Sequence, residues 1–443
     1  MFKKSILAVS VAATFSVTAF ADAEVDGPIA FDPIAGSAYA TSTDPAILNS
    51  TPWIVPEGYT QKIISDETSL DIYKSNDWPD MNTVNETRKH AGRYLYRTHE
   101  VRPGNDLRND GKLGGAVSVV DLKTGETREL VTRTDWEALD GIVWTPWNTI
   151  LFAEEAINSE YADPDVPQAT SGLVYELTLE KKDLMTAESV TVRPLLGSLS
   201  HEGIETDAEG NVYVIDEDRS GAIYKFVPEN YGDLSSGQLY ALKVDNGAKT
   251  GTASWVALDM NQVQISARVA AKAVGATPFC RPEDLERIRK TMYAALTCED
   301  VTNPANTSGA GAVLSITLGE IPVVKYFVAH GVNVGYENKT TGVTGFKSPD
   351  NLADGPDGKL WIVEDNVPSD IWVAEPDADG DGYSDGVSLF ASLQDAGAEG
   401  TGIYFGKDPQ KLFVNVQHSV TGNDKTMVIM KNRKHHGHDE YED

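Results

Sequence analysis

Basic residues and long apolar runs are scarce in this chain of 443 residues. Lysine and arginine number 37 against 67 acidic residues, which gives a formal net charge of -30. Binding to a phosphate backbone or to an anionic membrane surface needs a basic face, so we expect no nucleic-acid partner. After the N-terminus no segment reaches the ~20 apolar residues that a membrane-spanning helix needs. We therefore expect no membrane insertion.

Sequence motifs for two common kinds of catalysis are also missing. No Gly-x-Ser-x-Gly elbow is present, so a serine nucleophile is not indicated. No Walker or dinucleotide-binding glycine motif lies between a strand and a helix, which argues against a nucleotide cofactor. Only two cysteines occur, Cys280 and Cys298. In an oxidising compartment such a pair is more often a disulfide than a metal site, and we predict the disulfide.

The chain begins with the features of a Sec-type signal peptide over residues 1–21. Lys3 and Lys4 precede the apolar run 6–17, and Ala19-Phe20-Ala21 resembles a cleavage site. We expect a periplasmic or secreted protein that is a monomer. Residues 22–60, rich in small and polar residues, are expected to form an extended leader outside the main domain. Residues 61–430 carry the strand pattern, and 431–443 form a charged tail.

One sequence pattern recurs along residues 61–430. It consists of an acid, a short turn, an aromatic-rich strand that ends in acids, then glycine and another apolar strand. The clearest copy contains His201-Glu202, the strand 212–215 and Asp216-Glu217. Five further copies, some looser, bring the number to six. Strand-rich repeats of this kind predict an all-β fold, a six-bladed β-propeller with an N-terminal extension and a few short helices in loops. One helix is predicted at residues 263–274.

Equivalent positions of propeller blades converge on one axis, so the repeated acids should crowd together. Alone, each acid would more often cap a turn, and a high acid content also serves solubility. As a set, these negative charges would repel one another, and cations bound between them are the simplest way to compensate the repulsion. The set is Glu202, Glu217, Glu283, Glu299, Asp350 and Asp365.

A separate loop has the spacing of a calcium site. Its acids stand at loop positions 1, 3, 5 and 9, with glycine at position 6, but position 12 is Ser388 instead of glutamate. The alternative is an acidic surface turn; we predict a structural calcium remote from any chemistry. The four acids are Asp377, Asp379, Asp381 and Asp385.

Several short motifs, in collinear order over roughly residues 85–430, resemble the PhoX-type alkaline phosphatases. They include 94–101 (Tyr-Leu-Tyr-Arg-Thr-His-Glu-Val), Ser200-His201-Glu202, Arg281-Pro282-Glu283, Ser348-Pro349-Asp350 and 413–418 (Phe-Val-Asn-Val-Gln-His). The resemblance implies a six-bladed propeller that hydrolyses small phosphate monoesters at a cluster of iron and several calcium ions in its channel.

When the family's ligand positions are transferred to this sequence, the resemblance implies that the catalytic metal ligands are Glu155, Glu202, Glu283 and Asp350. Glu399 and Glu100 are further candidates, and His201 and His418 are candidates for contact with substrate. The alternative for each histidine is a hydrogen-bonded structural role.

Two departures from the family pattern matter. Ala153 stands where the family has an iron-ligating cysteine, and a missing thiolate counts against the iron part of the cluster. Lys3-Lys4 replaces a twin-arginine signal, so we expect the chain to take up its metals outside the cytoplasm. The competing hypotheses are a non-catalytic, calcium-stabilised binding module and, by fold analogy alone, a calcium-dependent lactonase or other esterase.

Overall fold

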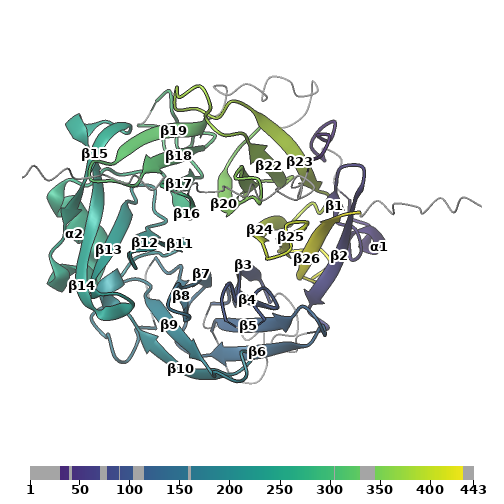
Figure 1. Ribbon diagram of the computed structural model, residues 1–443, viewed down its shortest axis with the longest axis horizontal. Helices are drawn as coiled ribbons and strands as arrows, with labels where there is room; N and C mark the ends of the chain where they lie inside the picture. Colours follow the sequence, from purple (N-terminus) through teal and green to yellow (C-terminus); the bar gives the residue numbers. More distant parts are fainter. Residues whose placement is uncertain are drawn as a thin grey trace, which may run out of the picture.

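A computed structural model describes residues 30–38, 42–69, 77–88, 90–102, 114–157, 161–303, 305–329 and 345–432. The predicted signal peptide and the tail from residue 433 onward lie outside these ranges. The described chain is nearly all β, with strands arranged around a central axis (Figure 1). The prediction of an all-β propeller is confirmed by this architecture.

Antiparallel meanders form the blades, and their strands run outward from the axis in chain order. Blade 1 consists of β3 (Pro79–Val84), β4 (Tyr94–His99), β5 (Ala116–Asp121) and β6 (Thr127–Thr132). Blade 2 consists of β7 (Leu139–Trp144), β8 (Ile150–Glu154), β9 (Val174–Leu179) and β10 (Ala187–Val192). Blade 3 consists of β11 (Ile204–Thr206), β12 (Val212–Ile215), β13 (Ile223–Asn230), β14 (Asp233–Val244) and β15 (Gly251–Ala257).

The second half of the ring repeats this pattern. Blade 4 consists of β16 (Pro282–Ile288), β17 (Thr291–Leu296), β18 (Ala312–Thr317) and β19 (Val323–Ala329). Blade 5 consists of β20 (Pro349–Asp354), β21 (Leu360–Glu364), β22 (Asp370–Ala374) and β23 (Val387–Leu393). Blade 6 consists of β24 (Glu399–Phe405), β25 (Lys411–Gln417) and β26 (Lys425–Lys431), and β2 (Tyr59–Asp66) completes it.

Two pairings extend beyond single meanders. β15 pairs with β19 through Gly251 and Val324, so blades 3 and 4 share one nine-stranded sheet. β1 (Trp53–Ile54) pairs with β23 and adds a strand to the outside of blade 5. The described part of the leader therefore contributes the helix α1 (Pro45–Leu48) and strands to the outer edge of the ring.

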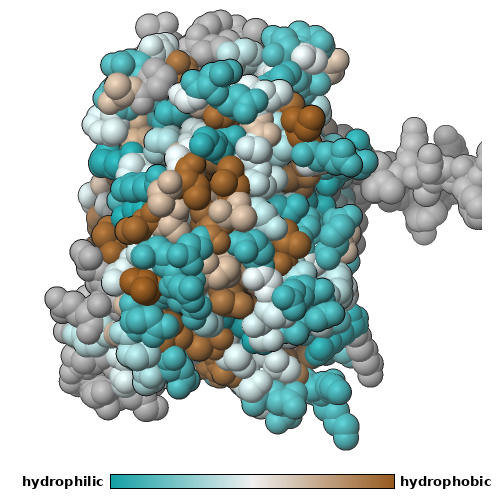
Figure 2. Space-filling view, turned by 90° about the vertical axis from the view of Figure 1, so that its left-hand side faces the viewer, coloured by the Kyte–Doolittle hydropathy of each residue, from teal (hydrophilic) through white to brown (hydrophobic). Residues whose placement is uncertain are grey.

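The predicted helix is present as α2 (Met260–Val274), which begins three residues earlier than expected. Asp259 caps its N-terminus, and its C-terminus ends at Gly275 in the left-handed conformation (φ 69°). A break lies at Ser266, whose φ of -161° is not helical. Figure 2 views the side of the ring that carries α2 and β14, where apolar side chains are exposed between polar ones. Val269 of α2 is one of the exposed apolar residues of the protein. No helix in the described ranges is long and apolar enough to cross a membrane.

Apolar side chains pack between neighbouring blades. Leu151 of blade 2 and Val214 of blade 3, for example, belong to one cluster, and Val363 of blade 5 packs with Val414 of blade 6. Within the ring, the innermost strands contact one another in the cyclic order β3, β7, β11, β16, β20, β24 and back to β3. This closed ring places the start of every innermost strand at the same end of the central channel.

Candidate metal centre in the channel

One acid from each blade lies at or next to the start of its innermost strand. In blades 1, 2, 4 and 5 the strand carries a β-bulge at this point, with the pairing of β3 and β4 shifting between Pro79 and Asn82, for instance. A bulge redirects side chains, which is why such irregularities recur near functional sites. The six acids, which we call the inner acids, are Asp80, Asp140, Glu202, Glu283, Asp350 and Glu399.

Hydrogen bonds between neighbouring blades fix the backbone around the inner acids. Gly203 N donates to Glu283 O at 2.8 Å. A Cβ at Gly141 would lie 1.7 Å from Glu202 O, so only glycine permits this close approach of blades 2 and 3. The inner acids are therefore held by the scaffold itself, and not by mobile loops.

Four blades share an unusual backbone conformation two residues before the inner acid. Trp78, Ala138, Arg281 and Ser348 all have positive φ, between 42° and 52°. Each of their carbonyls accepts a hydrogen bond from a backbone N–H at the end of the next strand; Trp78 O, for example, accepts from Glu100 N at 3.0 Å. Non-glycine residues in this conformation are strained, and such strain clusters at functional sites.

The residues that donate these N–H groups, with Glu217 in blade 3, form a second tier, which we call the rim residues. Most of them are acids as well. In blade 4 the equivalent residue is Thr297, which donates a hydrogen bond to Glu283. The rim residues are Glu100, Glu155, Glu217, Thr297 and Asp365.

Three inner acids gather closely enough to share one ion. Glu202, Glu283 and Asp350 each offer a carboxylate oxygen, and these oxygens lie within 4.8 Å of one another. Asp140 Oδ1, Glu202 Oε2 and Glu283 Oε2 are buried and have no hydrogen-bond partner among the described residues. Buried, unpartnered carboxylate oxygens are costly, and a cation would satisfy them.

The pKa values of these carboxyl groups reflect their crowding. Burial, with the charge of Glu283 as the next cause, raises the pKa of Glu202 well above its usual value. Burial raises the pKa of Glu283 to about 7. The pKa values of Asp80, Asp140, Glu155, Asp350 and Glu399 are raised as well, in each case mainly by burial and then by neighbouring acids. Without bound metal ions, the ionised form of these carboxyl groups is therefore disfavoured.

Two arginines and one histidine lie at this end of the channel. Arg281 Nε is 2.6 Å from Glu217 Oε1 and 3.1 Å from Glu283 Oε1. Arg102 lies 3.1 Å from Glu100 and 3.5 Å from Glu155. His418 Nε2 is 3.4 Å from Glu399 Oε1, and its ring contacts Trp78 edge-on. Burial lowers the pKa of His418, which favours a neutral imidazole there.

His201 does not share this placement. It is fully buried, its Nε2 lies 2.9 Å from Gly197 O, and burial lowers its pKa to about 4. Substrate cannot reach a side chain with no exposed surface, so the structure favours the structural role over contact with substrate. Glu299 also lies apart from the inner acids, accepting from Cys280 N at 3.0 Å and Tyr326 Oη at 3.1 Å.

Both cysteines are paired: the structure contains the Cys280–Cys298 disulfide, as predicted. Ala153 is buried in the apolar cluster between blades 2 and 3, packed with Val174 and Leu199. Among the described residues no thiolate is therefore available to the channel. The donor set is made of oxygen atoms only, which suits a hard cation such as Ca²⁺ and does not fit a thiolate-anchored iron.

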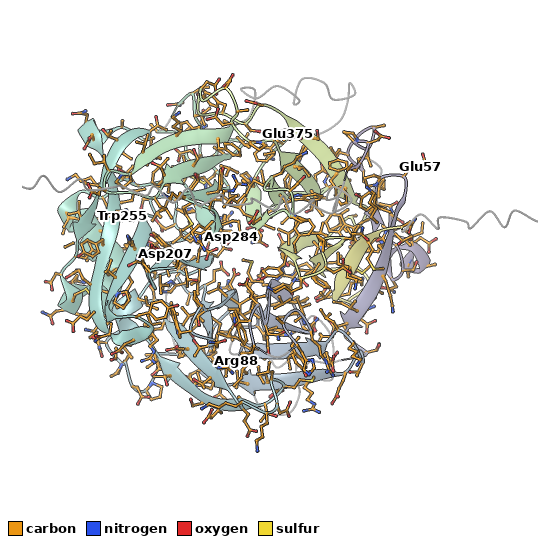
Figure 3. The ribbon with its side chains drawn as sticks, in the orientation of Figure 1. Glu57, Arg88, Asp207, Trp255, Asp284 and Glu375 are labelled. Atoms are coloured by element: carbon orange, nitrogen blue, oxygen red, sulfur yellow. A yellow bond between two sulfur atoms is a disulfide. The ribbon has the colours of Figure 1, made fainter. Side chains whose placement is uncertain are left out.

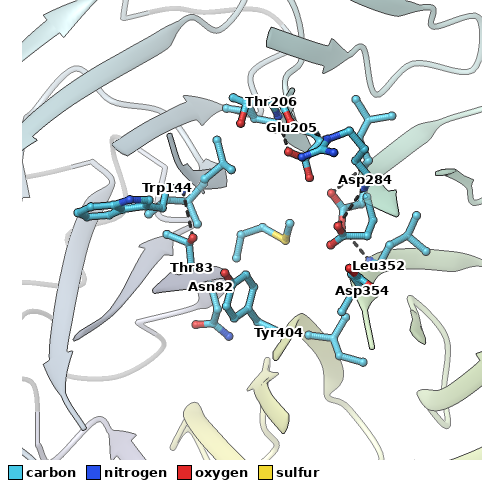
Figure 4. A pocket seen from close by; sticks show the side chains of 18 of the residues that line it. Asn82, Thr83, Trp144, Glu205, Thr206, Asp284, Leu352, Asp354 and Tyr404 are labelled. Carbon is cyan, nitrogen blue, oxygen red and sulfur yellow. Dashed lines mark hydrogen bonds between the residues drawn. The ribbon is translucent and has the colours of Figure 1, made fainter. Parts of the chain in front are cut away.

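The opposite end of the channel contains a separate cavity of about 340 Å³ (Figure 4). Its lining includes Met81, Ile142, Leu285 and other apolar residues that follow the inner acids by one to three positions. Acids also line this cavity. One of them is Asp284, which Figure 3 shows near the centre of the ring. Burial raises the pKa of Asp284 to about 7 and that of Glu205 to about 8.

The predicted calcium loop gathers three of its four acids. Oxygens of Asp377, Asp379 and Asp385 lie within 4.8 Å of one another, whereas Asp381 is not part of this group. Gly380 N and Gly382 N donate to the two oxygens of Asp377 at 2.8 and 2.9 Å. The loop joins β22 to β23, and Ser388 lies within β23.

Asp80 and Asp140 were not predicted from the sequence as members of the inner set. A usable pattern was present nonetheless, because Pro79-Asp80 matches Pro282-Glu283 and Pro349-Asp350 at the strand start.

These features define the class: a β-propeller whose channel carries a ring of carboxylates suited to metal ions. The family described as "Alkaline phosphatase PhoX" matches residues 141–419, which is more than half of the chain. The chain belongs to this family.

A solved structure shows the same fold. Pseudomonas fluorescens PhoX in complex with vanadate, a transition state analogue, is 18% identical, with a TM-score of 0.66 over 91% of this chain and 98% of that one. A virginiamycin B lyase from Staphylococcus aureus is 13% identical, with a TM-score of 0.45 over 84% of this chain and 99% of that one, a likeness too weak to carry an argument. No curated protein matches the chain in sequence.

Proposed function

We propose that this protein is an exported, calcium-dependent phosphatase that hydrolyses phosphate monoesters at the inner acids. The observation that carries the proposal is the convergence of one carboxylate from every blade on one end of the channel, in a member of a phosphatase family. The Sec-type signal and the expectation of a monomeric, periplasmic or secreted protein belong to the same proposal.

The residues that would hold the ions are Glu202, Glu283 and Asp350, with Asp140, Glu155, Glu399 and Asp80 around them. Bound calcium would neutralise charge on the transferring phosphoryl oxygens and lower the pKa of a bound water. The protein supplies fixed positions for these carboxylates and a buried environment, so little reorganisation is needed when substrate arrives.

Substrate should enter from the end that carries the rim residues. Arg102, Arg281 and His418 lie there, and guanidinium groups match phosphate oxygens in charge and geometry. Their present partners are rim and inner acids, which would turn to the metal ions once these are bound. The cavity at the opposite end is lined by acids such as Glu205, Asp284 and Glu286, which would repel a phosphate dianion.

The test compares p-nitrophenyl phosphate hydrolysis and metal content in the wild type and in Glu202→Gln and Glu283→Gln. Each substitution keeps the side-chain volume but removes one negative charge, and we expect a loss of ~100-fold or more in kcat/KM with less bound calcium. Glu205→Gln is the matched control, since Glu205 is a half-buried acid on β11, three residues after Glu202, and lines the far cavity. We expect this control to keep its calcium and its activity.

Chelation of the wild type gives the second arm. Activity that a chelator abolishes and Ca²⁺ restores supports the proposal, and iron content then reports whether iron is present without a thiolate. Bound calcium without any turnover would favour the non-catalytic binding module instead, which Ala153 in place of the family cysteine motivates. Wild-type rates in both glutamine variants would refute the proposal.

A further inference from the structure

The ring closes between blade 6 and blade 1, where the two ends of the described chain meet. β2, from the N-terminal part of the chain, is the outer strand of blade 6 and pairs with β26, with Asp66 opposite Lys425. The described apolar cluster between blades 6 and 1 has five buried members, including Val84 and Phe413. The described clusters at the other interfaces have 13 to 19 buried members, so within the described part of the chain apolar packing is weakest at the closure.

Polar contacts replace apolar ones at this interface. Arg97 is fully buried and donates from Nη1 to Thr426 Oγ1 at 2.7 Å and from Nε to Ser118 Oγ at 3.1 Å. Asn82 Nδ2 donates to Asn415 Oδ1 at 3.2 Å across the two blades. The closure therefore depends on a buried polar network, in which every unpartnered group is costly.

Three carboxylates meet beside this network, in a group that shares no member with the inner acids. Glu67 follows β2, Asp77 precedes β3, and Asp424 precedes β26. One oxygen from each lies within 4.8 Å of the others. Asp77 and Asp424 are 1% and 0% exposed.

Two of these carboxylates present an oxygen without a partner. Asp424 Oδ1 accepts from Ser419 N at 2.8 Å, and the backbone of Trp78 also lies beside this carboxylate. Its Oδ2 is buried and has no hydrogen-bond partner of normal geometry among the described residues. Asp77 Oδ1 is likewise buried and unpartnered, and Asp77 Oδ2 is 3.8 Å from His99 Nδ1. A buried carboxylate left unpartnered is destabilising, so a group that fills this place would stabilise the fold.

The nearby cationic side chains make their hydrogen bonds elsewhere, although the charge of Arg97 acts on Asp77 and that of Lys425 acts on Asp424. Lys425 Nζ donates to Leu48 O at 3.1 Å, and Arg97 points two nitrogens at hydroxyl groups. Within the described part of the chain, neither side chain forms an ion pair with Asp77 or Asp424. His99 Nδ1 lies 2.7 Å from Asp77 O and its Nε2 lies 2.8 Å from Ser118 Oγ.

We propose that Glu67, Asp77 and Asp424 bind a calcium ion that joins blade 6 to blade 1. Three carboxylates without nitrogen or sulfur ligands form a donor set for a hard divalent cation, and water would complete its coordination. The ion would connect the end of β2 to the segment before β3 in blade 1 and to the segment before β26 in blade 6. It is a third site, distinct from the channel and from the Asp377 loop, and it does not depend on the proposed phosphatase activity.

The test measures bound calcium per chain and the rise in Tm on adding Ca²⁺ to the chelated full-length protein. We expect Asp424→Asn to bind one calcium fewer than the wild type and to show a smaller calcium-dependent rise in Tm. Glu67→Gln, at the most exposed of the three ligands, should weaken calcium binding at this site tenfold or more without preventing folding.

Asp395→Asn is the matched control. Asp395 is also buried near the closure, but its oxygens accept from Ser419 Oγ at 2.7 Å and from Gly397 N at 3.2 Å. We expect this variant to keep the wild-type calcium stoichiometry. Unchanged stoichiometry and an unchanged calcium-dependent Tm in both Asp424→Asn and Glu67→Gln would overturn the proposal and indicate protonated carboxyl groups instead.

Discussion

The stability of this protein should fall as the pH rises from 5 to 8, and Asp284 should account for a measurable part of the fall. Asp284 lies on β16, where its Oδ1 accepts from Leu285 N at 2.6 Å and its Oδ2 accepts from Leu352 N of blade 5 at 2.8 Å. It is 3% exposed, and burial raises its pKa from 3.8 to about 7.

Because the folded-state pKa lies above the unfolded value, the contribution of Asp284 to stability is fully present below pH 3.8. It is lost as the pH rises to about 7, at ~1.4 kcal/mol per pH unit. Between pH 5 and pH 8 the loss amounts to roughly 2–3 kcal/mol, since the folded-state carboxyl group ionises around pH 7. Asp284→Asn removes the ionisation and keeps one acceptor oxygen.

The assay is urea unfolding of both proteins in saturating Ca²⁺ at pH 5, 6, 7 and 8. The difference in unfolding free energy between wild type and Asp284→Asn should change by about 2–3 kcal/mol across this range, in favour of the variant at high pH. Asp121→Asn is the control: Arg93 lowers the pKa of Asp121, so it stays ionised in both states throughout. A difference for Asp284→Asn that does not vary with pH would refute the reasoning.

Three further predictions concern the positions that shape or stabilise the ring. Gly141→Ala places a Cβ against Glu202 O and should lower both Tm and phosphatase activity, whereas Gly319→Ala, with open space around it, should change the unfolding free energy by less than ~0.5 kcal/mol. Replacing both Cys280 and Cys298 by Ser opens an 18-residue loop and should cost ~3 kcal/mol in chemical unfolding, with calcium content unchanged. Asp377→Asn should remove one calcium per chain and leave kcat unchanged within twofold, because its loop lies at the outside of blade 5; a parallel loss of activity would contradict this.

The second and third strands of the blades could be predicted from the sequence because their side chains follow the apolar pattern of a buried sheet. β12, for example, matches the expected strand 212–215. The innermost strands could not be recognised in the same way. β20 has the sequence Pro-Asp-Asn-Leu-Ala-Asp, which is typical of a turn and forms a strand because neighbouring blades fix it.

The same limit applies to the site. The repeat placed Glu202, Glu283 and Asp350 at equivalent positions, and the structure brings them together. Whether a given acid faces the channel depends on a single-residue shift at the bulge, however. Glu154 accepts from Glu137 N and Leu173 N, while the adjacent Glu155 lies among the rim residues. Sequence spacing alone does not determine that choice.

The pairing of β15 with β19 has a consequence for how the molecule meets other proteins. The outermost strand of a blade normally presents unpaired backbone groups, which can recruit a strand from another chain and start aggregation. Here two such edges pair with each other through Gly251-Thr252 and Val323-Val324, and the two residues of β1 cover one end of the edge of blade 5. Strand addition from outside is thereby hindered at these positions of blades 3, 4 and 5.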